Sequence, residues 1–231
     1  MITFALDLSS EVGSIAMLED GQLLGQEELL RAQNRTTPLM EAIDGLRRSV
    51  GLEWESVDLF AAGSGPGRYA GLRVAVTTVQ HLALPDQRPV RVVPSGAALA
   101  VSVAAQSREV ERILVIGDAR RDRIWCGEFL VMDPVLEQVG DWRLIELADV
   151  PATFAQSADQ GRTHIISSEW ERLQPLLESI AAWESDQWEH SAGWPSAEWI
   201  ARLAEHEEQV GLPRAPLSPI YLHPPVAKAN Q

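Results

Sequence analysis

The chain has 231 residues, of which 33 are acidic and 19 are basic, so its formal net charge is −14. Such an excess of negative charge repels a polyanion, which argues against a protein that binds nucleic acid by itself. The sequence has no run of about 18 apolar residues, so we expect no membrane span. Its N-terminus lacks the basic start of a signal peptide, and Cys126 is its single cysteine. We therefore expect a cytoplasmic protein without disulfides.

The first thirty residues predict three strands. An apolar strand, Met1–Leu6, is followed by the alternating segment Gly13–Leu18. Asp20-Gly21 is a typical hairpin turn and leads into a third strand, Gln22–Leu30. Because short turns join neighbouring strands antiparallel, the chain is expected to open with an antiparallel meander.

Two helices are expected next, separated by a strand and a glycine cluster. Thr37 is a preferred helix-capping residue with Pro38 after it, and apolar residues then recur at helical spacing up to Gly51. Val57–Gly63 predicts a strand, and a further helix is expected over residues 70–84. A strand that turns sharply into a helix brings backbone N–H groups close to an anion or to a second backbone.

The glycine cluster formally matches a dinucleotide-binding motif, because Gly65-Pro66-Gly67-Arg68-Tyr69-Ala70 reads G-x-G-x-x-A. The acidic residue that would hold the ribose should lie at the end of the next strand. Asp86 has the right spacing but precedes that strand, which ends at Val93-Pro94. No G-K-[ST] follows the glycines either, so both a dinucleotide fold and a P-loop are rejected.

The strand pattern then restarts. Ile113–Gly117 is an apolar strand that ends at Asp118, and a polar turn leads into the strand Arg123–Val131, as Met1–Leu6 leads through Asp7 into its hairpin. This similarity predicts one unit used twice. We expect subdomains over residues 1–106 and 107–212 and an extended, proline-rich tail over residues 213–231. Further elements are expected in the second half: a helix over 146–158, a strand over 164–167, and helices over 169–183 and 196–210.

Metal and nucleophile sites find little support in the sequence. The five histidines never occur at i, i+4 spacing, and a single cysteine cannot build a zinc site. No G-x-S-x-G elbow is present. What remains is a pair of hairpins that follow Asp7 and Asp118, with Ser9 beside the first. They could face each other across a phosphate-binding cleft, although spacing alone favours simple turn capping.

Four segments in order, ALDLSS, GSGPGRYAGLRVAV, IGDARRDRIWCGEF and PIYLHPP, resemble the signatures of the TsaB family. The resemblance implies an α/β protein with a duplicated actin-like, sugar-kinase-like (ASKHA) ATPase fold, in which each subdomain has a mixed sheet and helices. It implies a non-catalytic subunit that docks on and stabilises TsaD, the catalytic subunit that makes N6-threonylcarbamoyladenosine in tRNA beside the anticodon. A TsaE-like ATPase joins that assembly. The tRNA is then bound only through the complex, and ATP and a metal ion are expected on partner subunits, with no cofactor on this chain.

Departures from the family pattern fall in the nucleotide region. Leu8 stands where the family has a small hydroxyl residue, and Arg68, Tyr69 and Ala70 replace the usual residues after Gly67. They remove hydroxyl donors and crowd the turn. The nucleotide-binding candidates are Asp7, Ser9, Gly65, Gly67 and Asp118; whether this chain binds a nucleotide stays open.

The helices that follow residues 37 and 70 form the contact with TsaD in the family. The second helix is apolar nearly all round, which is typical of a helix buried on more than one side. The predicted partner interface consists of Leu39, Ile43, Leu72, Val76, Val79 and Ala83. The sequence predicts that Val76→Asp or Val79→Asp would separate the partners and leave the fold intact. The same helices could pair two copies into a homodimer when the partner is absent.

Two other functions stay open. The first is an ATP-dependent phosphotransferase or ATPase of the same fold, using Asp7 and Asp118. The second is a peptidase, against which the missing nucleophile motif and missing metal ligands argue.

Overall fold

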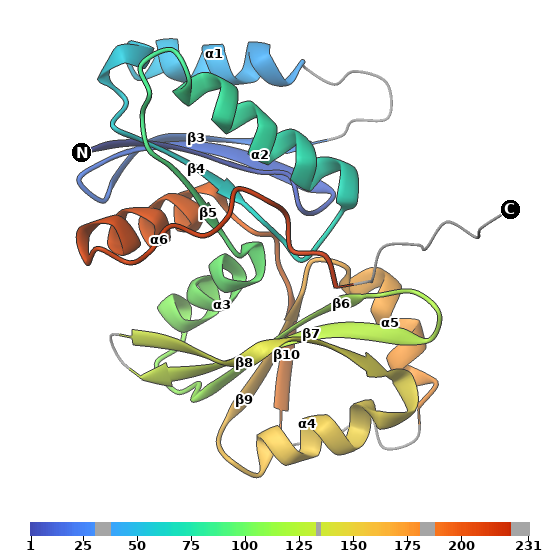
Figure 1. The fold of residues 1–231 in the computed structure, drawn as a ribbon. Helices are drawn as coiled ribbons and strands as arrows, with labels where there is room; N and C mark the ends of the chain where they lie inside the picture. The colour runs from blue at the N-terminus through green and yellow to red at the C-terminus, as the bar shows by residue number, and fades with distance from the viewer. Residues whose placement is uncertain (31–37, 133–134, 181–187, 223–231) are drawn as a thin grey trace, which may run out of the picture.

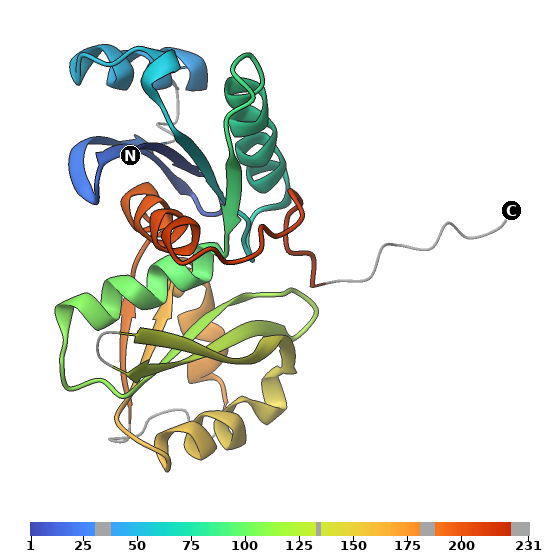
Figure 2. The same ribbon diagram turned by 60° about the vertical axis from the view of Figure 1, so that its left-hand side comes forward.

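Two mixed sheets of five strands carry the fold of this chain (Figures 1 and 2). The structure is a computed structural model that describes residues 1–30, 38–132, 135–180 and 188–222. Thr37, the expected capping residue, lies outside the described residues.

The first sheet has the strand order β3-β2-β1-β4-β5. Its strands are β1 (Ile2–Asp7), β2 (Val12–Glu19), β3 (Gln22–Leu30), β4 (Leu59–Gly63) and β5 (Val90–Val93). β1, β2 and β3 pair antiparallel, so the expected meander is confirmed. β1 pairs parallel with β4, and β4 with β5.

The second sheet repeats this arrangement in the order β10-β9-β6-β7-β8. Its strands are β6 (Arg112–Asp118), β7 (Arg123–Met132), β8 (Val135–Glu146), β9 (Thr163–Ser167) and β10 (Trp188–Ala192). β6, β7 and β8 pair antiparallel, and β6, β9 and β10 pair parallel. Each strand therefore has a counterpart in the first sheet, β6 matching β1 and β9 matching β4. The predicted duplication and the α/β architecture, with a mixed sheet and helices in each half, are confirmed.

Six α-helices and two short 3-10 helices complete the described part of the chain. They are α1 (Leu39–Ser49), η1 (Trp54–Ser56), α2 (Tyr69–Ala83), α3 (Ser95–Gln106), η2 (Leu147–Asp149), α4 (Val150–Ala158), α5 (Trp170–Glu178) and α6 (Ala197–Gln209). The helix expected over residues 146–158 begins later, at Val150, because η2 occupies the residues before it. β10 was not predicted, since its sequence WEHSA shows neither a run of apolar residues nor a buried alternate face.

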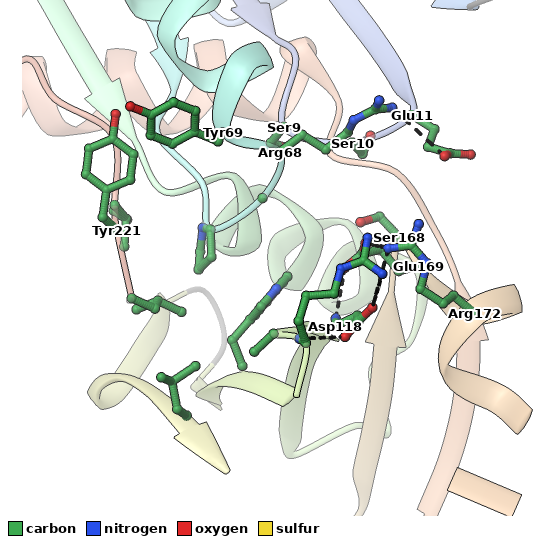
Figure 3. A pocket seen from close by; sticks show the side chains of 18 residues that line it. Ser9, Ser10, Glu11, Arg68, Tyr69, Asp118, Ser168, Glu169, Arg172 and Tyr221 are labelled. Carbon is green, nitrogen blue, oxygen red and sulfur yellow. Dashed lines mark hydrogen bonds and ion pairs between the residues drawn. The ribbon is translucent and has the colours of Figure 1, made fainter. Parts of the chain in front are cut away.

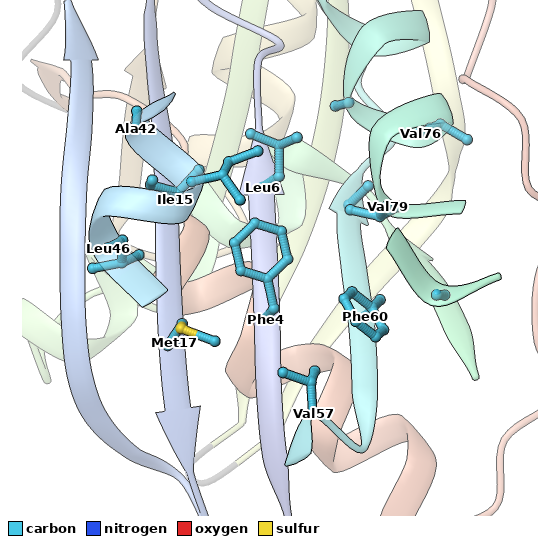
Figure 4. Packing of buried hydrophobic residues seen from close by; sticks show 14 of the residues in the cluster. Phe4, Leu6, Ile15, Met17, Ala42, Leu46, Val57, Phe60, Val76 and Val79 are labelled. Atoms are coloured by element: carbon cyan, nitrogen blue, oxygen red, sulfur yellow. The ribbon is translucent and has the colours of Figure 1, made fainter. Parts of the chain in front are cut away.

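The helices α1 and α2 cover one face of the first sheet (Figure 4). Phe4 and Leu6 of β1 meet Ile43 of α1 and Val79 of α2 in this core, and each of the four side chains is fully buried. The outer face of the second sheet is covered in the same way by α4 and α5, through Phe154 and other apolar side chains.

A shared layer of two helices, α3 and α6, lies between the sheets (Figure 2). α6 follows the second sheet in the sequence but packs against β1, β2, β4 and β5 of the first. α3 directs Ala98 to the first sheet and Leu99 to the core of the second. The boundaries proposed at residues 106 and 212 stay a prediction. Helix α3 of the first half packs on the second sheet, and helix α6 of the second half packs on the first.

Candidate functional site: the cleft between the two halves

A cavity of about 890 Å³ opens between the two halves of the chain (Figure 3). We call it the cleft. Its walls are the β1–β2 and β4–α2 turns of the first half, the β6–β7 and β9–α5 turns of the second half, and residues 220–222. The turns that the sequence placed at the two Asp-ended strands therefore do meet across one cavity.

Asp7 lies behind the wall of the cleft and is fully buried. Its Oδ1 atom accepts hydrogen bonds from the Ser9 backbone N–H (2.8 Å) and the Ser9 hydroxyl (2.6 Å). Its Oδ2 atom accepts one from the Ser95 hydroxyl (2.6 Å), and the Ser95 oxygen accepts the N–H of Gly65 (3.0 Å). Burial raises the pKa of the Asp7 carboxyl, against the opposing effect of these hydrogen bonds. Asp7 thus joins the end of β1, the glycine turn and the start of α3.

The glycine cluster is explained by close packing on the first hairpin. A Cβ atom at Gly67 would lie 2.4 Å from the carbonyl oxygen of Ser9, and one at Gly71 would lie 1.9 Å from that of Leu8. The N–H of Arg68 donates to the same Ser9 oxygen at 2.7 Å. Contacts this short exclude any side chain. The glycines therefore let one backbone approach another, as the sharp strand-to-helix turn suggested.

On the opposite wall, the carboxyl group of Asp118 is surrounded by arginine. Its Oδ1 atom accepts the backbone N–H of Arg120 (2.7 Å), and its Oδ2 atom pairs with the guanidinium groups of Arg120 (3.2 Å) and Arg172 (3.4 Å). Glu169 accepts the N–H of Asp118 at 2.9 Å and also pairs with Arg172 at 3.1 Å. Burial raises the pKa of the Glu169 carboxyl. The charges on this wall are thus largely neutralised among themselves.

The turn that carries Arg120 has an unusual backbone. Arg120, Arg121 and Asp122 have φ angles of 64°, 54° and 56°, a region that residues with a side chain seldom adopt. Such conformations cost free energy and persist where the surroundings hold them in place. The hydrogen bond from the Arg120 N–H to the Asp118 carboxylate is one contact that holds this turn in place.

The predicted nucleotide candidates divide into two groups. Ser9, Gly67 and Asp118 line the cleft, whereas Asp7 and Gly65 lie buried behind it. Sequence reasoning did not assign Arg120 or Arg172 to the site. Arg120 was visible in the turn after Asp118, but Arg172 comes from α5, and no local pattern indicates that it reaches the cleft.

The predicted interface residues are mostly part of the first core. Five of the six side chains are at most 3% exposed: Ile43, Leu72, Val76, Val79 and Ala83. Leu39 is partly buried. The expectation that Val76→Asp or Val79→Asp would leave the fold intact is wrong, because either change would put an unpaired charge into this core.

Among the described residues, no group of three or more histidine, cysteine, aspartate or glutamate side chains is arranged to hold a metal ion. None of the described helices is both long enough and apolar enough to cross a membrane.

Comparison with known proteins identifies the family. A family model described as "TsaD: tRNA N6-adenosine threonylcarbamoyltransferase" matches residues 30–161. The TsaB protein of Haemophilus influenzae is 31% identical over 144 residues, which are 61% of this chain and 60% of that protein. The TsaB protein of Bacillus subtilis is 27% identical over 150 residues, 64% of each chain. Both are described as tRNA threonylcarbamoyladenosine biosynthesis proteins.

The matched segment spans about three-fifths of the length of these relatives. A solved structure of YeaZ from Pseudomonas aeruginosa superposes with a TM-score of 0.76 at 26% identity, covering 96% of this chain and 99% of that one. The chain therefore belongs to the family that the TsaD model defines, and within it to the TsaB proteins.

Proposed function

We propose that this chain is a non-catalytic subunit in the synthesis of N6-threonylcarbamoyladenosine in tRNA, and that it docks on a TsaD-type catalytic subunit in the cytoplasm. The observation that carries the proposal is the family membership, supported by the names of the TsaB relatives. A TsaE-like ATPase is the third component. The net charge of −14 supports a division of labour in which partner subunits bind the tRNA, ATP and the metal ion.

We propose that the contact with the catalytic subunit uses the outward faces of α1 and α2. Both helices bury their inward faces in one core, so their outward faces point away from the first sheet. Met40 on α1 and Val74 on α2 are 53% and 46% exposed, although both are apolar. We expect a partner to cover these two apolar side chains together with the outward faces of both helices.

Gly45 supports the same face. It lies in the middle of α1 and is exposed, and a Cβ atom there would meet nothing within 4 Å. Glycine inside a helix costs about 1 kcal/mol relative to alanine, and no contact within the described chain requires it here. A helix of the partner that packs closely on α1 would explain why glycine is used at this position.

The docking face is tested with Gly45→Arg and Val74→Asp, which alter exposed positions. Met132→Asp on β7, at a side chain that is 49% exposed, is the matched control. Both outer-face variants should lose co-elution with the catalytic subunit of the same organism in size-exclusion chromatography, and the control should keep it. All three should unfold within about 1 kcal/mol of the parent chain, as surface substitutions usually do. Complex formation by both outer-face variants would refute this docking face.

The same face could pair two copies of the chain when the catalytic subunit is absent. In that case the chain alone should sediment as a dimer, and Gly45→Arg and Val74→Asp should sediment as monomers.

The function itself is tested separately, by mass analysis of tRNA nucleosides from a strain depleted of this chain. We expect threonylcarbamoyladenosine to fall. An unchanged level would refute the proposed function, whatever the binding experiments show.

Binding of a nucleotide in the cleft is a second candidate function. It is favoured by one observation, that Ser9, Gly67 and Asp118 line the same cavity. Calorimetric titration with ATP and Mg²⁺ tests it. Binding that is lost in Asp118→Ala would favour the nucleotide site, and an absence of heat would count against it.

A further inference from the structure

The segment after α6 returns to the cleft and is tied down at its start. Arg91 of β5 is only 3% exposed and donates to the backbone carbonyl of Leu212 at 2.8 Å. The same guanidinium group pairs with Glu208 at 2.6 Å, and Arg214 pairs with Glu208 from the other side. A buried arginine with several partners is a rigid anchor, because breaking it leaves the other groups unpaired.

The far end of the segment is tied to both halves of the chain. The N–H of Ile220 donates to the carbonyl oxygen of Ser64 at 2.8 Å. The ring of Tyr221 lies against that of Tyr69, with centroids 5.3 Å apart (Figure 3). Leu222 packs against the apolar core of the second half. Ile220, Tyr221 and Leu222 all line the cleft.

Between these two ends the chain has no regular secondary structure, and residues 211–218 are exposed. Pro213, Pro216 and Pro219 restrict this stretch, so holding it extended costs little conformational entropy. The firm anchor lies at residue 212, and the contacts at residues 220–222 are few and individually weak. Local opening is therefore expected to begin at the cleft end.

We propose that residues 213–222 form a strap along one side of the cleft, in which Ile220, Tyr221 and Leu222 make one wall of the cavity and link the two halves of the chain. The strap touches the glycine turn of the first half and the core of the second half at successive residues. Its displacement would therefore do two things at once: it would remove one wall of the cavity, and it would break a link that holds the two halves at a fixed separation.

The docking of the strap is tested by amide hydrogen exchange on the full chain. The parent chain should protect the N–H of Ile220. Tyr221→Ala removes the ring contact and should speed this exchange at least tenfold, which corresponds to about 1.4 kcal/mol. Tyr221→Phe keeps the ring and Leu217→Ala alters an exposed neighbour, so both controls should exchange like the parent. An unprotected Ile220 in the parent chain, or equal exchange in Tyr221→Ala, would overturn the proposal.

The link between the halves is tested by pulsed electron resonance with spin labels at Thr77→Cys on α2 and Gln156→Cys on α4, both exposed. Cys126 is fully buried, and burial raises the pKa of its thiol to about 12, so it should stay unlabelled. The distance distribution should be narrow in the otherwise unchanged chain and should broaden or lengthen when Tyr221→Ala is added. Near-ultraviolet circular dichroism checks that this variant stays folded. Identical distributions in the folded proteins would show that the strap does not hold the halves.

Discussion

The two halves of this chain place an aspartate at the same point of the same topology and use it differently. Asp7 ends β1 and Asp118 ends β6, the matching first strands of the two sheets. Asp7 is fully buried and accepts hydrogen bonds from Ser9 and Ser95. Asp118 lines the cleft and pairs with two arginines. The fold sets where the carboxyl group lies, and its neighbours decide whether it is an anchor or part of a binding wall.

The strands that pair with β1 and β6, namely β4 and β9, also end differently. β4 ends at Gly63, and a Cβ atom there would lie 1.7 Å from the Asp7 carboxylate. Its counterpart β9 ends at Ser167, which is buried and accepts the N–H of Glu169. The end of β4 thus packs its backbone directly against the Asp7 side chain, whereas the end of β9 has room for a side chain. The two matching strand ends therefore differ in how closely they are packed.

The largest difference between the halves should come from alanine at these two strand ends. Gly63→Ala would force the carboxylate of Asp7 out of its place and should lower the free energy of unfolding by about 3 kcal/mol. Ser167→Ala removes one hydrogen bond and should cost about 1 kcal/mol. Urea denaturation of both variants measures these values. Equal losses would contradict the claim that the end of β4 is packed more tightly than the end of β9.

Removing the two aspartates should give the next largest contrast. Asp7→Ala leaves the hydroxyl groups of Ser9 and Ser95 and a buried N–H without their acceptor, and should cost about 2 kcal/mol. Asp118→Ala removes the hydrogen bond from the Arg120 N–H and two ion pairs whose arginines are partly exposed, and should cost about 1 kcal/mol. Thermal unfolding would register the first as a clear drop in Tm and the second as a small one. A larger effect at Asp118 would reverse the roles assigned to the two residues.

The pH dependence of stability should differ between the parent chain, in which Asp7 titrates, and the variant Asp7→Asn, in which residue 7 does not. Because the folded-state pKa of Asp7 is raised, its contribution to stability is fully present below the unfolded-state pKa of about 3.9 and is lost as pH rises through the folded value. Asp7→Asn removes this titration. The unfolding free energy of the parent chain relative to Asp7→Asn should therefore fall as pH rises above the unfolded-state pKa. A difference that is constant, or that rises with pH, would argue against the raised pKa.

The smallest effect is expected on the arginine wall. Arg172 is 43% exposed, so Arg172→Ala should change the free energy of unfolding by less than about 1 kcal/mol. Arg162→Ala is the control, since Arg162 is similarly exposed and pairs with Glu109 and Glu189 outside the cleft. Differential scanning calorimetry should find the two alike. A clearly larger loss in Arg172→Ala would mean that this wall helps to hold the fold.

The parts of the fold that the sequence predicted are those with a local signal. The Asp20-Gly21 turn and the similarity between the two Asp-ended strands are each carried by a few neighbouring residues, and from them the meander and the duplication followed. The layer of α3 and α6 between the sheets has no such signal, because it depends on contacts between residues far apart in the sequence, such as Arg91 and Glu208, which are separated by 117 positions.

The site was predicted in the same uneven way. Ser9, Gly67 and Asp118 lie at turns that the sequence marks, and they do line the cleft. The predicted interface residues were chosen because apolar residues recur at helical spacing on two helices. This spacing identifies the face of a helix that packs on its own sheet, so the chosen residues, such as Val76, lie in the core. The exposure of Gly45 and Val74 follows only from the structure, which separates the buried face of each helix from its exposed face.

The shared layer has a consequence for how the protein is made. α6 covers the inner face of the first sheet, yet it is synthesised after every other described helix and strand, at residues 197–209. While the chain emerges from the ribosome, the first half can bring α1 and α2 onto its sheet but leaves the other face of that sheet bare. Ala5, Ala16 and Leu59, which α6 finally covers, should stay accessible to water or to a chaperone until residues 197–209 have left the ribosome. Nascent chains that stop before residue 197 should therefore bind a hydrophobic dye, whereas released chains that contain α6 should not.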